Sequence, residues 1–299
     1  MRFDPHYVSN LNQSLNASSL NEQTLTQQLS SGLRVSNLSG DPVAAAQNVL
    51  LSSSISQSDS YVQGASHQEA QLQVTDSALG QVVTDVTSVL SLAVSAGDGT
   101  ITASNLSSIA GQVSSLRDSI LSLANTSYLG QYVFAGSQGS TQPFVLDTSS
   151  DPATTTYQGD NVAQSIATPS GQKIQVNLPG TAIFSAPGSD LLGSINQLVS
   201  DLTNGNTSAV SADTNAISNA LSTVNTQRSV LGGSLSQING SSSYVSTQEA
   251  QMKVQQSTLL ASDPTTVATG LSNAEVQSQS LLSVIATLSK RETLFDALN

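Results

Sequence analysis

Apolar residues recur at alternating steps of three and four along much of this 299-residue chain. From 51 to 93, ten of thirteen positions at this spacing are apolar, where the overall composition would give about five. The same spacing gives nine of thirteen from 217 to 259 and six of six from 106 to 123. Such spacing places one apolar seam on a helix and is typical of helices that pack along one another.

Weaker seams of the same period lie at both ends of the chain, where polar residues interrupt them. Such seams are too weak to hold a lone helix in water. We therefore predict that these terminal helices serve assembly with other subunits more than folding of the monomer. The predicted assembly residues are Leu11, Leu15, Leu25, Leu29, Leu281, Ile285, Leu288 and Phe295.

Two Asp-Pro pairs separate the terminal helices from the inner ones. Asp41 and Asp263 are suited to accept the free amides at a helix start, and Pro42 and Pro264 lose nothing at the first helical position. Each pair is predicted to be a helix break.

The helical seam disappears between about 132 and 188. Prolines and aromatics gather there, and turn residues separate four candidate strands at 132–134, 144–146, 173–178 and 181–184. A small β-rich segment is therefore predicted between two helical arms.

The predicted fold is mainly α, with a long antiparallel helical bundle or coiled-coil rod formed by the N- and C-terminal arms and a small inserted β-rich domain. The predicted domains are a terminal helix of an assembly core (1–41), the first rod arm (42–131), the β-rich domain (132–190), the second rod arm (191–262) and the other terminal helix (263–299).

Charged residues make up only 9% of the chain, and 20 acidic against 8 basic residues give a net charge of −12. A nucleic-acid-binding protein needs a basic surface, so this class is excluded. No uninterrupted apolar run approaches the length that spans a bilayer, so no membrane insertion is expected. The start of the chain also lacks the apolar core of a secretory signal peptide.

Catalytic and metal-binding residue patterns are scarce. The chain has no cysteine and only two histidines, His6 and His67, neither of which lies near a nucleophile-elbow motif. Two histidines without cysteine or a His-Glu-x-x-His pattern do not form a typical zinc site. The sequence therefore predicts no enzyme activity, no cofactor and no metal.

Asp76 and Arg228 both occupy otherwise apolar positions of the tested seams. If the two inner helices run antiparallel, Arg228 faces about position 80, one helical turn from Asp76. An internal ion pair is one hypothesis. The alternatives are that Arg228 extends to solvent or contacts a neighbouring subunit.

Several segments, in this order, resemble the bacterial flagellin superfamily. They are 29–35 (LSSGLRV), 40–46 (GDPVAAA), 75–79 (TDSAL), 124–136 (ANTSYLGQYVFAG), 227–233 (QRSVLGG) and 293–298 (TLFDAL). Three details are closer to the hook–filament junction proteins of this superfamily than to filament flagellins: Asp41-Pro42, the 157–160 segment YQGD, and the LFDAL ending. Gly40 departs from the pattern, which often has an acidic residue there.

This resemblance implies a structural protein that joins the flagellar hook, through a neighbouring hook-associated protein, to the flagellin filament by helical subunit packing. The alternative is flagellin, the filament subunit itself. The resemblance also implies secretion by flagellar type III export, an extracellular location at the junction, and contacts with copies of itself, flagellin and an export chaperone.

Overall fold

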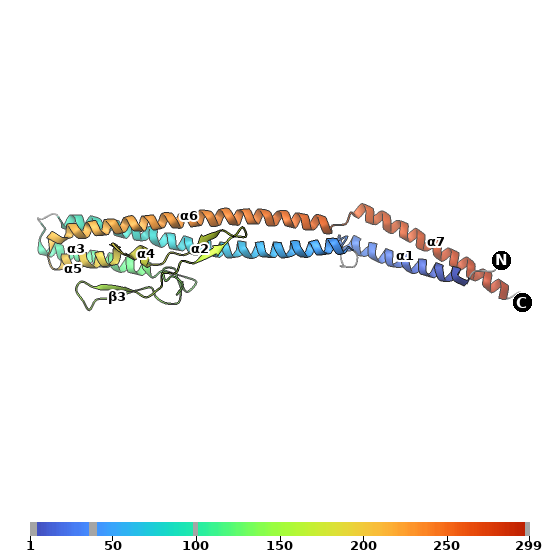
Figure 1. The fold of residues 1–299 in the computed structure, drawn as a ribbon, viewed down its shortest axis with the longest axis horizontal. Coiled ribbons are helices and arrows are strands. Elements are labelled where there is room, and N and C mark those ends of the chain that lie inside the picture. Colours follow the sequence, from blue (N-terminus) through green and yellow to red (C-terminus); the bar gives the residue numbers. More distant parts are fainter. Residues whose placement is uncertain (1–4, 36–40, 98–100, 297–299) are drawn as a thin grey trace. The chain divides into compact units, whose positions relative to one another are not determined.

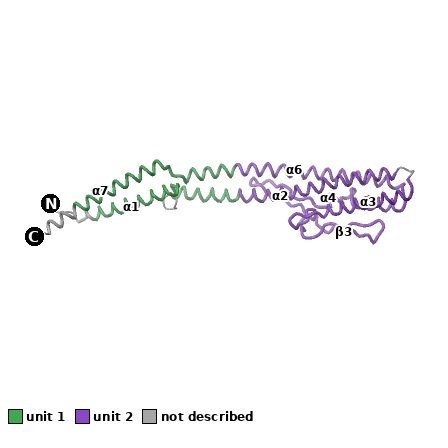
Figure 2. The backbone as a smooth tube through the Cα atoms, turned by 180° about the vertical axis from the view of Figure 1, so that it is seen from behind, with its two compact units in different colours: residues 1–57, 248–299 green, residues 58–247 purple. Residues whose placement is uncertain are grey.

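The computed structural model of the chain describes residues 5–35, 41–97 and 101–296, and the side chains of these residues other than 5, 6, 8 and 288–296. The described chain is mainly helical, with a few small antiparallel sheets (Figure 1). The predicted fold class is confirmed. Contacts divide it into two compact units, Met1–Gln57 with Gln248–Asn299 (unit 1) and Ser58–Thr247 (unit 2) (Figure 2).

Unit 1 consists of helices from both ends of the chain. Helices α1 (Pro5–Ser31) and α7 (Pro264–Asp296) pack along each other. The unit also holds the beginning of α2 (Pro42–Ala96) and the end of α6 (Thr207–Leu260). Here the Gln256 amide donates to Asn48 Oδ1 at 2.8 Å, which ties the two helices together.

Unit 2 is a helical bundle with short β-hairpins beside it. The rest of α2 and α6 packs with α3 (Ala103–Ala124) and α5 (Leu191–Thr203). Side-chain caps set where the two shorter helices begin: Thr102 Oγ1 accepts the Asn105 amide, and Asp190 Oδ1 accepts the Gly193 amide. These bonds satisfy amides that a helix start leaves without partners.

The β-rich segment contains four separate two-stranded antiparallel sheets. They pair β1 (Ser127–Tyr128) with β2 (Gln131–Tyr132), β3 (Phe144–Asp147) with β4 (Thr154–Tyr157), β5 (Ser165–Ala167) with β6 (Lys173–Gln175), and β7 (Ser185–Ala186) with β8 (Ser189–Asp190). The largest sheet pairs Phe144 with Tyr157 and Asp147 with Thr154.

The prediction of a strand at 181–184 is wrong, because these residues form the one-turn helix α4 (Thr181–Phe184). The amides of Ile183 and Phe184 donate to the Gly180 carbonyl and close the turn. Both side chains are fully buried, and a short buried apolar run does not distinguish a strand from a helical turn.

Two further boundaries in the middle of the chain differ from the prediction. The strand expected at 132–134 ends at Tyr132, and the chain turns at Val133 and Phe134. The second arm, predicted as one stretch, contains a break at 204–206, where Gly205 adopts a φ of +71°.

The buried face of the inner helices is rotated by about one residue from the tested seams. Six of the thirteen tested seam positions in α2 are buried, including Leu72, Leu79 and Val86. Four of the other seven directly follow a buried residue, as Val83 follows Val82. Helix α6 shows the same displacement, because Ala220 is buried just before the half-buried Leu221. In α3 the displacement runs the other way, because Ala110 is buried just after the half-buried Ile109. Small residues at these positions let the helices approach closely.

Helix α2 meets the length and composition test for a membrane span, since an 18-residue window has a mean hydropathy of 1.4, with 39% of it buried. The sequence-based expectation, that no apolar stretch is long enough to span a bilayer, holds for uninterrupted apolar runs. It does not hold for hydropathy averaged over 18 residues of this helix. Leu79, Val82, Val86, Val89 and Ala93 of this helix are fully buried in unit 2. Packing in the bundle therefore accounts for these five side chains, whereas Val49, Leu50 and Val94 of the same helix are more than 60% exposed.

Three phenylalanines of the β-rich segment pack against one another and belong to the same buried core as the helices. The Phe184 ring lies 5.2 Å from that of Phe134 and 5.3 Å from that of Phe144, both edge to face. We expect Phe184→Ala to lower the free energy of unfolding by about 3–5 kcal/mol, because it leaves a cavity in this cluster. Urea unfolding measures the change. Val162→Ala, at an exposed position, is the control, and an equal loss there would contradict the expectation.

Candidate assembly site

The α1–α7 pair in unit 1 holds together through small side chains. Ser18 Oγ donates to the Ala274 carbonyl at 3.4 Å, and both residues are buried. A Cβ on Gly270 would meet the Leu25 methyl groups at 3.5 Å. The two helices therefore approach closely at these positions.

The predicted assembly residues divide into three groups in the structure. Leu11, Leu15, Leu25, Leu281 and Ile285 are half-buried, and Leu29 is exposed. The side chains of Leu288 and Phe295 lie outside the described residues. The assembly role of these residues stays a prediction.

Sequence reasoning missed the most exposed apolar side chains of this pair. Leu20 on α1 is 64% exposed, and Val276 and Leu282 on α7 are 61% and 51% exposed. They lie off the seam, so a search for one apolar stripe passes over them. A search for apolar residues outside the stripe would have found these three positions in the sequence.

The two helix breaks meet in unit 1 and are tied to each other. Helices α2 and α7 begin at Pro42 and Pro264. Leu33 and Ala261 form an antiparallel bridge, flanked by a bond from the Arg34 amide to the Leu260 carbonyl at 2.7 Å. The boundary between the two compact units lies inside α2 and α6, and the predicted domain division at the breaks stays a prediction.

Both break aspartates accept hydrogen bonds at helix starts. Asp41 Oδ1 accepts the Ala44 amide and its Oδ2 pairs with Arg34 Nη1, each at 3.0 Å. The Ala44 amide and then the Arg34 guanidinium lower the pKa of the Asp41 carboxyl. Asp263 accepts the Thr266 hydroxyl and the Thr265 amide, which lower its pKa in the same order.

Asp76 and Arg228 lie together between α2 and α6. Arg228 Nε donates to Asp76 Oδ1 at 3.0 Å and Nη2 donates to Oδ2 at 3.3 Å. A Cβ on Gly80 would lie 3.5 Å from Arg228 Nη2. The side chains remain 32% and 40% exposed for Arg228 and Asp76, because both positions lie beside the buried seam rather than on it.

This exposure makes the ion pair weaker than a buried pair. In a cycle of Arg228→Met, Asp76→Leu and the double variant, we expect a coupling of about 0.5–1 kcal/mol that falls with salt. Burial would have implied a cost of about 3–5 kcal/mol on breaking the pair. Chemical denaturation of the monomer measures the coupling, and strict additivity of the two changes would contradict it.

The segments 124–136 and 157–160, named in the resemblance, lock together in the structure. The Tyr157 hydroxyl donates to the Phe134 carbonyl at 2.9 Å or the Asp160 carbonyl at 2.8 Å. Asp160 Oδ1 accepts the Ser137 amide at 2.7 Å. A Cβ on Gly136 would overlap Asp160, and one on Gly159 would overlap the Tyr157 ring. Both glycines are therefore required by close approach.

Two glycines with positive φ provide a matched test of this packing. Gly136 has a φ of +72° and contacts Asp160, whereas Gly130 has a φ of +78° and open space around it. Alanine at Gly130 should cost about 1 kcal/mol for the backbone conformation alone. Alanine at Gly136 should cost clearly more, since Asp160 must also move. Urea unfolding of both variants measures this, and equal costs would contradict it.

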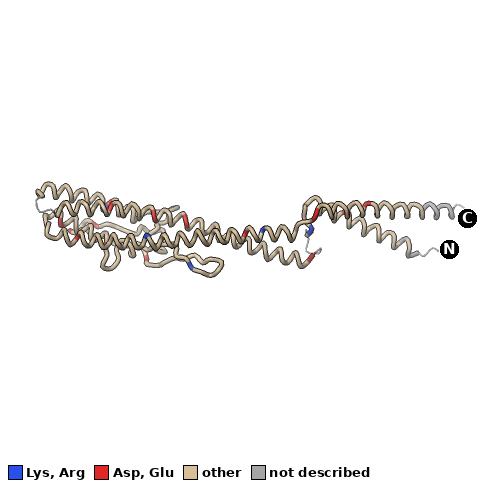
Figure 3. The backbone as a smooth tube through the Cα atoms, turned by 90° about the horizontal axis from the view of Figure 1, so that it is seen from above, with Lys and Arg blue, Asp and Glu red and all other residues tan. Residues whose placement is uncertain are grey.

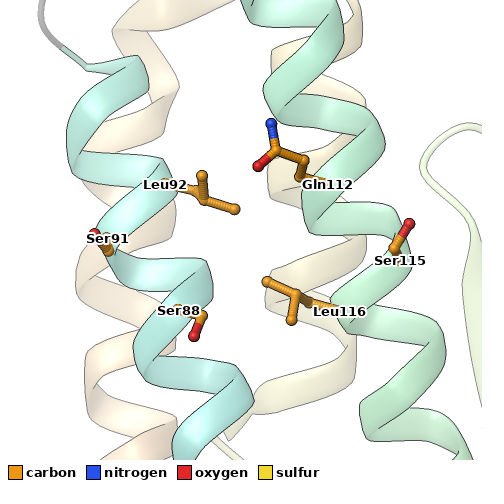
Figure 4. Close-up of a pocket in the computed structure, with 6 residues that line it drawn as sticks. All are labelled: Ser88, Ser91, Leu92, Gln112, Ser115 and Leu116. Carbon is orange, nitrogen blue, oxygen red and sulfur yellow. The ribbon is translucent and has the colours of Figure 1, made fainter.

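A groove of about 530 Å³ lies between α2 and α3 (Figure 4). Leu92 and Leu116 point toward each other across it, with Ser88 and Gln112 nearby. Its six lining residues include no titratable group. Within the described ranges, no three His, Asp or Glu side chains gather closely enough to hold a metal ion. His67 is exposed on α2, with its ring 5.7 Å from that of Tyr128.

Residues 6–139 match the family model of the bacterial flagellin N-terminal helical region. This part of the chain is thus similar to the helical region of flagellins, as the resemblance in the sequence predicted.

The relatives within that class are hook-associated proteins. The chain is 32% identical over 163 residues to flagellar hook-associated protein 3 of Salmonella typhimurium, which is 54% of this chain and 50% of that relative. The match thus spans half the length of that protein.

Two solved structures share the fold. The putative flagellar hook-associated protein of Vibrio parahaemolyticus has a TM-score of 0.67 at 21% identity, covering 74% of this chain and 99% of that one. The flagellar junction protein FlgL of Legionella pneumophila has a TM-score of 0.59 at 15% identity, covering 72% and 99%.

Proposed function

We propose that this protein is a structural component of the bacterial flagellum that joins the hook, through a neighbouring hook-associated protein, to the flagellin filament. The observation that carries the proposal is the set of exposed apolar side chains on α1 and α7, including Leu20 and Leu282. Burying such side chains against other subunits is favourable by about 25 cal/mol per Å². The hook-associated and junction proteins among the relatives support the same role.

The sparse charge of the helices suits close lateral packing between subunits. Most of the backbone in Figure 3 carries neither acidic nor basic residues. Fewer charges must be desolvated when such helices pack side by side. One heterologous contact repeated around an axis builds a ring or a helical array, which is the geometry that a junction between two tubular structures needs.

The proposed partners are copies of this chain, a hook-associated protein on the hook side and flagellin on the filament side. An export chaperone before secretion and an extracellular location at the junction complete the proposal. Its role is structural rather than catalytic, in line with its relatives.

The second candidate function is that of flagellin itself, because the matched family model describes the flagellin N-terminal region. Deletion of the gene distinguishes the two. Loss of a junction protein leaves hooks without filaments while flagellin leaks into the medium. Loss of the sole flagellin leaves none to leak, and that result would overturn the junction role.

Charges placed on the exposed apolar residues test the assembly surface. We expect Leu20→Asp and Leu282→Asp to abolish filament attachment while shifting monomer unfolding by less than about 0.5 kcal/mol, as is usual for exposed sites. Motility and electron microscopy of the hooks measure attachment.

Asn16→Asp adds the same charge at an exposed polar position of α1 and serves as the control. Filaments that attach normally to both apolar-to-Asp variants would show that this surface is not used.

A further inference from the structure

The side chains of two acidic residues, Asp201 and Asp213, interact inside unit 2, where α5 turns into α6. Asp201 is 7% exposed and Asp213 is 8% exposed. Asp213 lies on the buried face of α6 between Val210 and Ile217, which are almost completely buried. Asp201 precedes the buried Leu202 on α5. Two carboxyl groups therefore occupy an otherwise apolar part of the bundle.

The hydrogen bonds of these two carboxyl groups differ. Asp201 Oδ2 accepts the Gln197 side-chain amide and its Oδ1 accepts that of Asn206, each at 2.8 Å. These donors suit an ionised carboxylate. Asp213 Oδ2 is buried without a hydrogen-bond partner in the described structure. A buried, unpartnered carboxylate oxygen is costly, and a proton on Asp213 that bonds to Asp201 removes this cost.

Asp201 also holds the turn itself. Its backbone carbonyl accepts the Asn206 amide at 2.8 Å, and its side chain accepts the Asn206 side-chain amide. The turn contains Gly205 with a φ of +71°. An interaction between Asp201 and Asp213 therefore links the end of α5 and this turn to the second helical turn of α6.

Charged groups on the surrounding elements have partners of their own. Asp85 of α2 accepts from Gln81 and Ser119, Arg117 of α3 binds Asp118 and Ser114, Asp151 of the β3–β4 loop accepts from Asn204, and Asp190 caps α5. On α6, Arg228 pairs with Asp76. Asp98, before α3, lies outside the described residues. Among the described groups, Asp201 is the charged residue that raises the pKa of Asp213.

We propose that Asp201 and Asp213 share one proton. This proton stabilises the turn between α5 and α6, and its loss increases local opening of the chain at this end of unit 2. Loss of the proton leaves two negative charges in a buried site, where the described partners of the two carboxyl groups include no cation. The Asp201–Asp213 pair therefore responds to pH and needs no ligand besides the proton.

The direction of the pH dependence follows from the titration of Asp213. Burial, then the Asp201 charge and its hydrogen bond, raise the pKa of Asp213 from 3.8 to about 6. The folded protein holds this proton more tightly than the unfolded chain does. The resulting stability is fully present below pH 3.8 and is lost as the pH rises through about 6.

Carbon-13 NMR of the full chain tests the shared proton directly. The Asp213 carboxyl resonance should titrate with a midpoint near 6. A midpoint at the ordinary aspartate value of 3.8 would overturn the proposal. This measurement needs no variant and so does not depend on whether a substituted protein folds.

Hydrogen exchange tests the loosening. Amides of 198–217 should lose protection between about pH 5 and pH 8, after correction for intrinsic rates. Asp213→Asn keeps a neutral donor toward Asp201 and should abolish this loss. Asp85→Asn, which alters a buried carboxylate with two donors, should retain it. Loss of protection that persists in Asp213→Asn would overturn the proposal.

Discussion

Burial of one apolar stripe of α2 against the helices that follow it organises unit 2. Leu72, Leu79 and Val86 lie at heptad spacing on this stripe and are essentially inaccessible to solvent. Their partners on α6, including Ile217 and Val224, come more than a hundred residues later in the sequence. The helix pair can form only when the chain between them folds back. The hairpins and the α3 and α5 helices are therefore supported by, and complete, the same core.

The charged residues of unit 2 lie in different positions relative to this core. The chain carries few basic residues, and Arg228 lies beside the buried stripe, where its guanidinium reaches both Asp76 and solvent. The Asp201–Asp213 pair, in contrast, lies on buried faces without a described basic partner. The same helical packing thus produces a partly exposed ion pair in one place and a buried carboxyl pair in another, and the two respond differently to salt and pH.

Unit 1 has a different balance between internal packing and available surface. Its breaks are held by a short bridge, by Arg34 with Asp41, and by a small cluster of Val35, Ala44 and Ala45 with Leu259 and Leu260. Beyond them, α1 and α7 meet through Ser18, Ala274 and Gly270, so much of their apolar surface remains outside the pair. Exposed apolar side chains such as Leu20 and Leu282 are the surface that the proposed role at a junction requires, because contact with another subunit would bury them.

The sequence by itself determined the helical arms, the starts of α2 and α7 at Pro42 and Pro264, and the β-rich segment between the arms, because periodicity and helix capping are local properties. On the assumption that the two inner helices run antiparallel, it also placed Arg228 opposite about position 80, and in the structure Arg228 lies beside Gly80. The tertiary structure decided which side of each seam is buried: packing several helices together selected small residues such as Ala110 and Ala220 for close approach and moved Asp76 to the flank. It also decided that 181–184 form a helical turn and that Asp201 meets Asp213, because both depend on contacts between segments that no local pattern encodes.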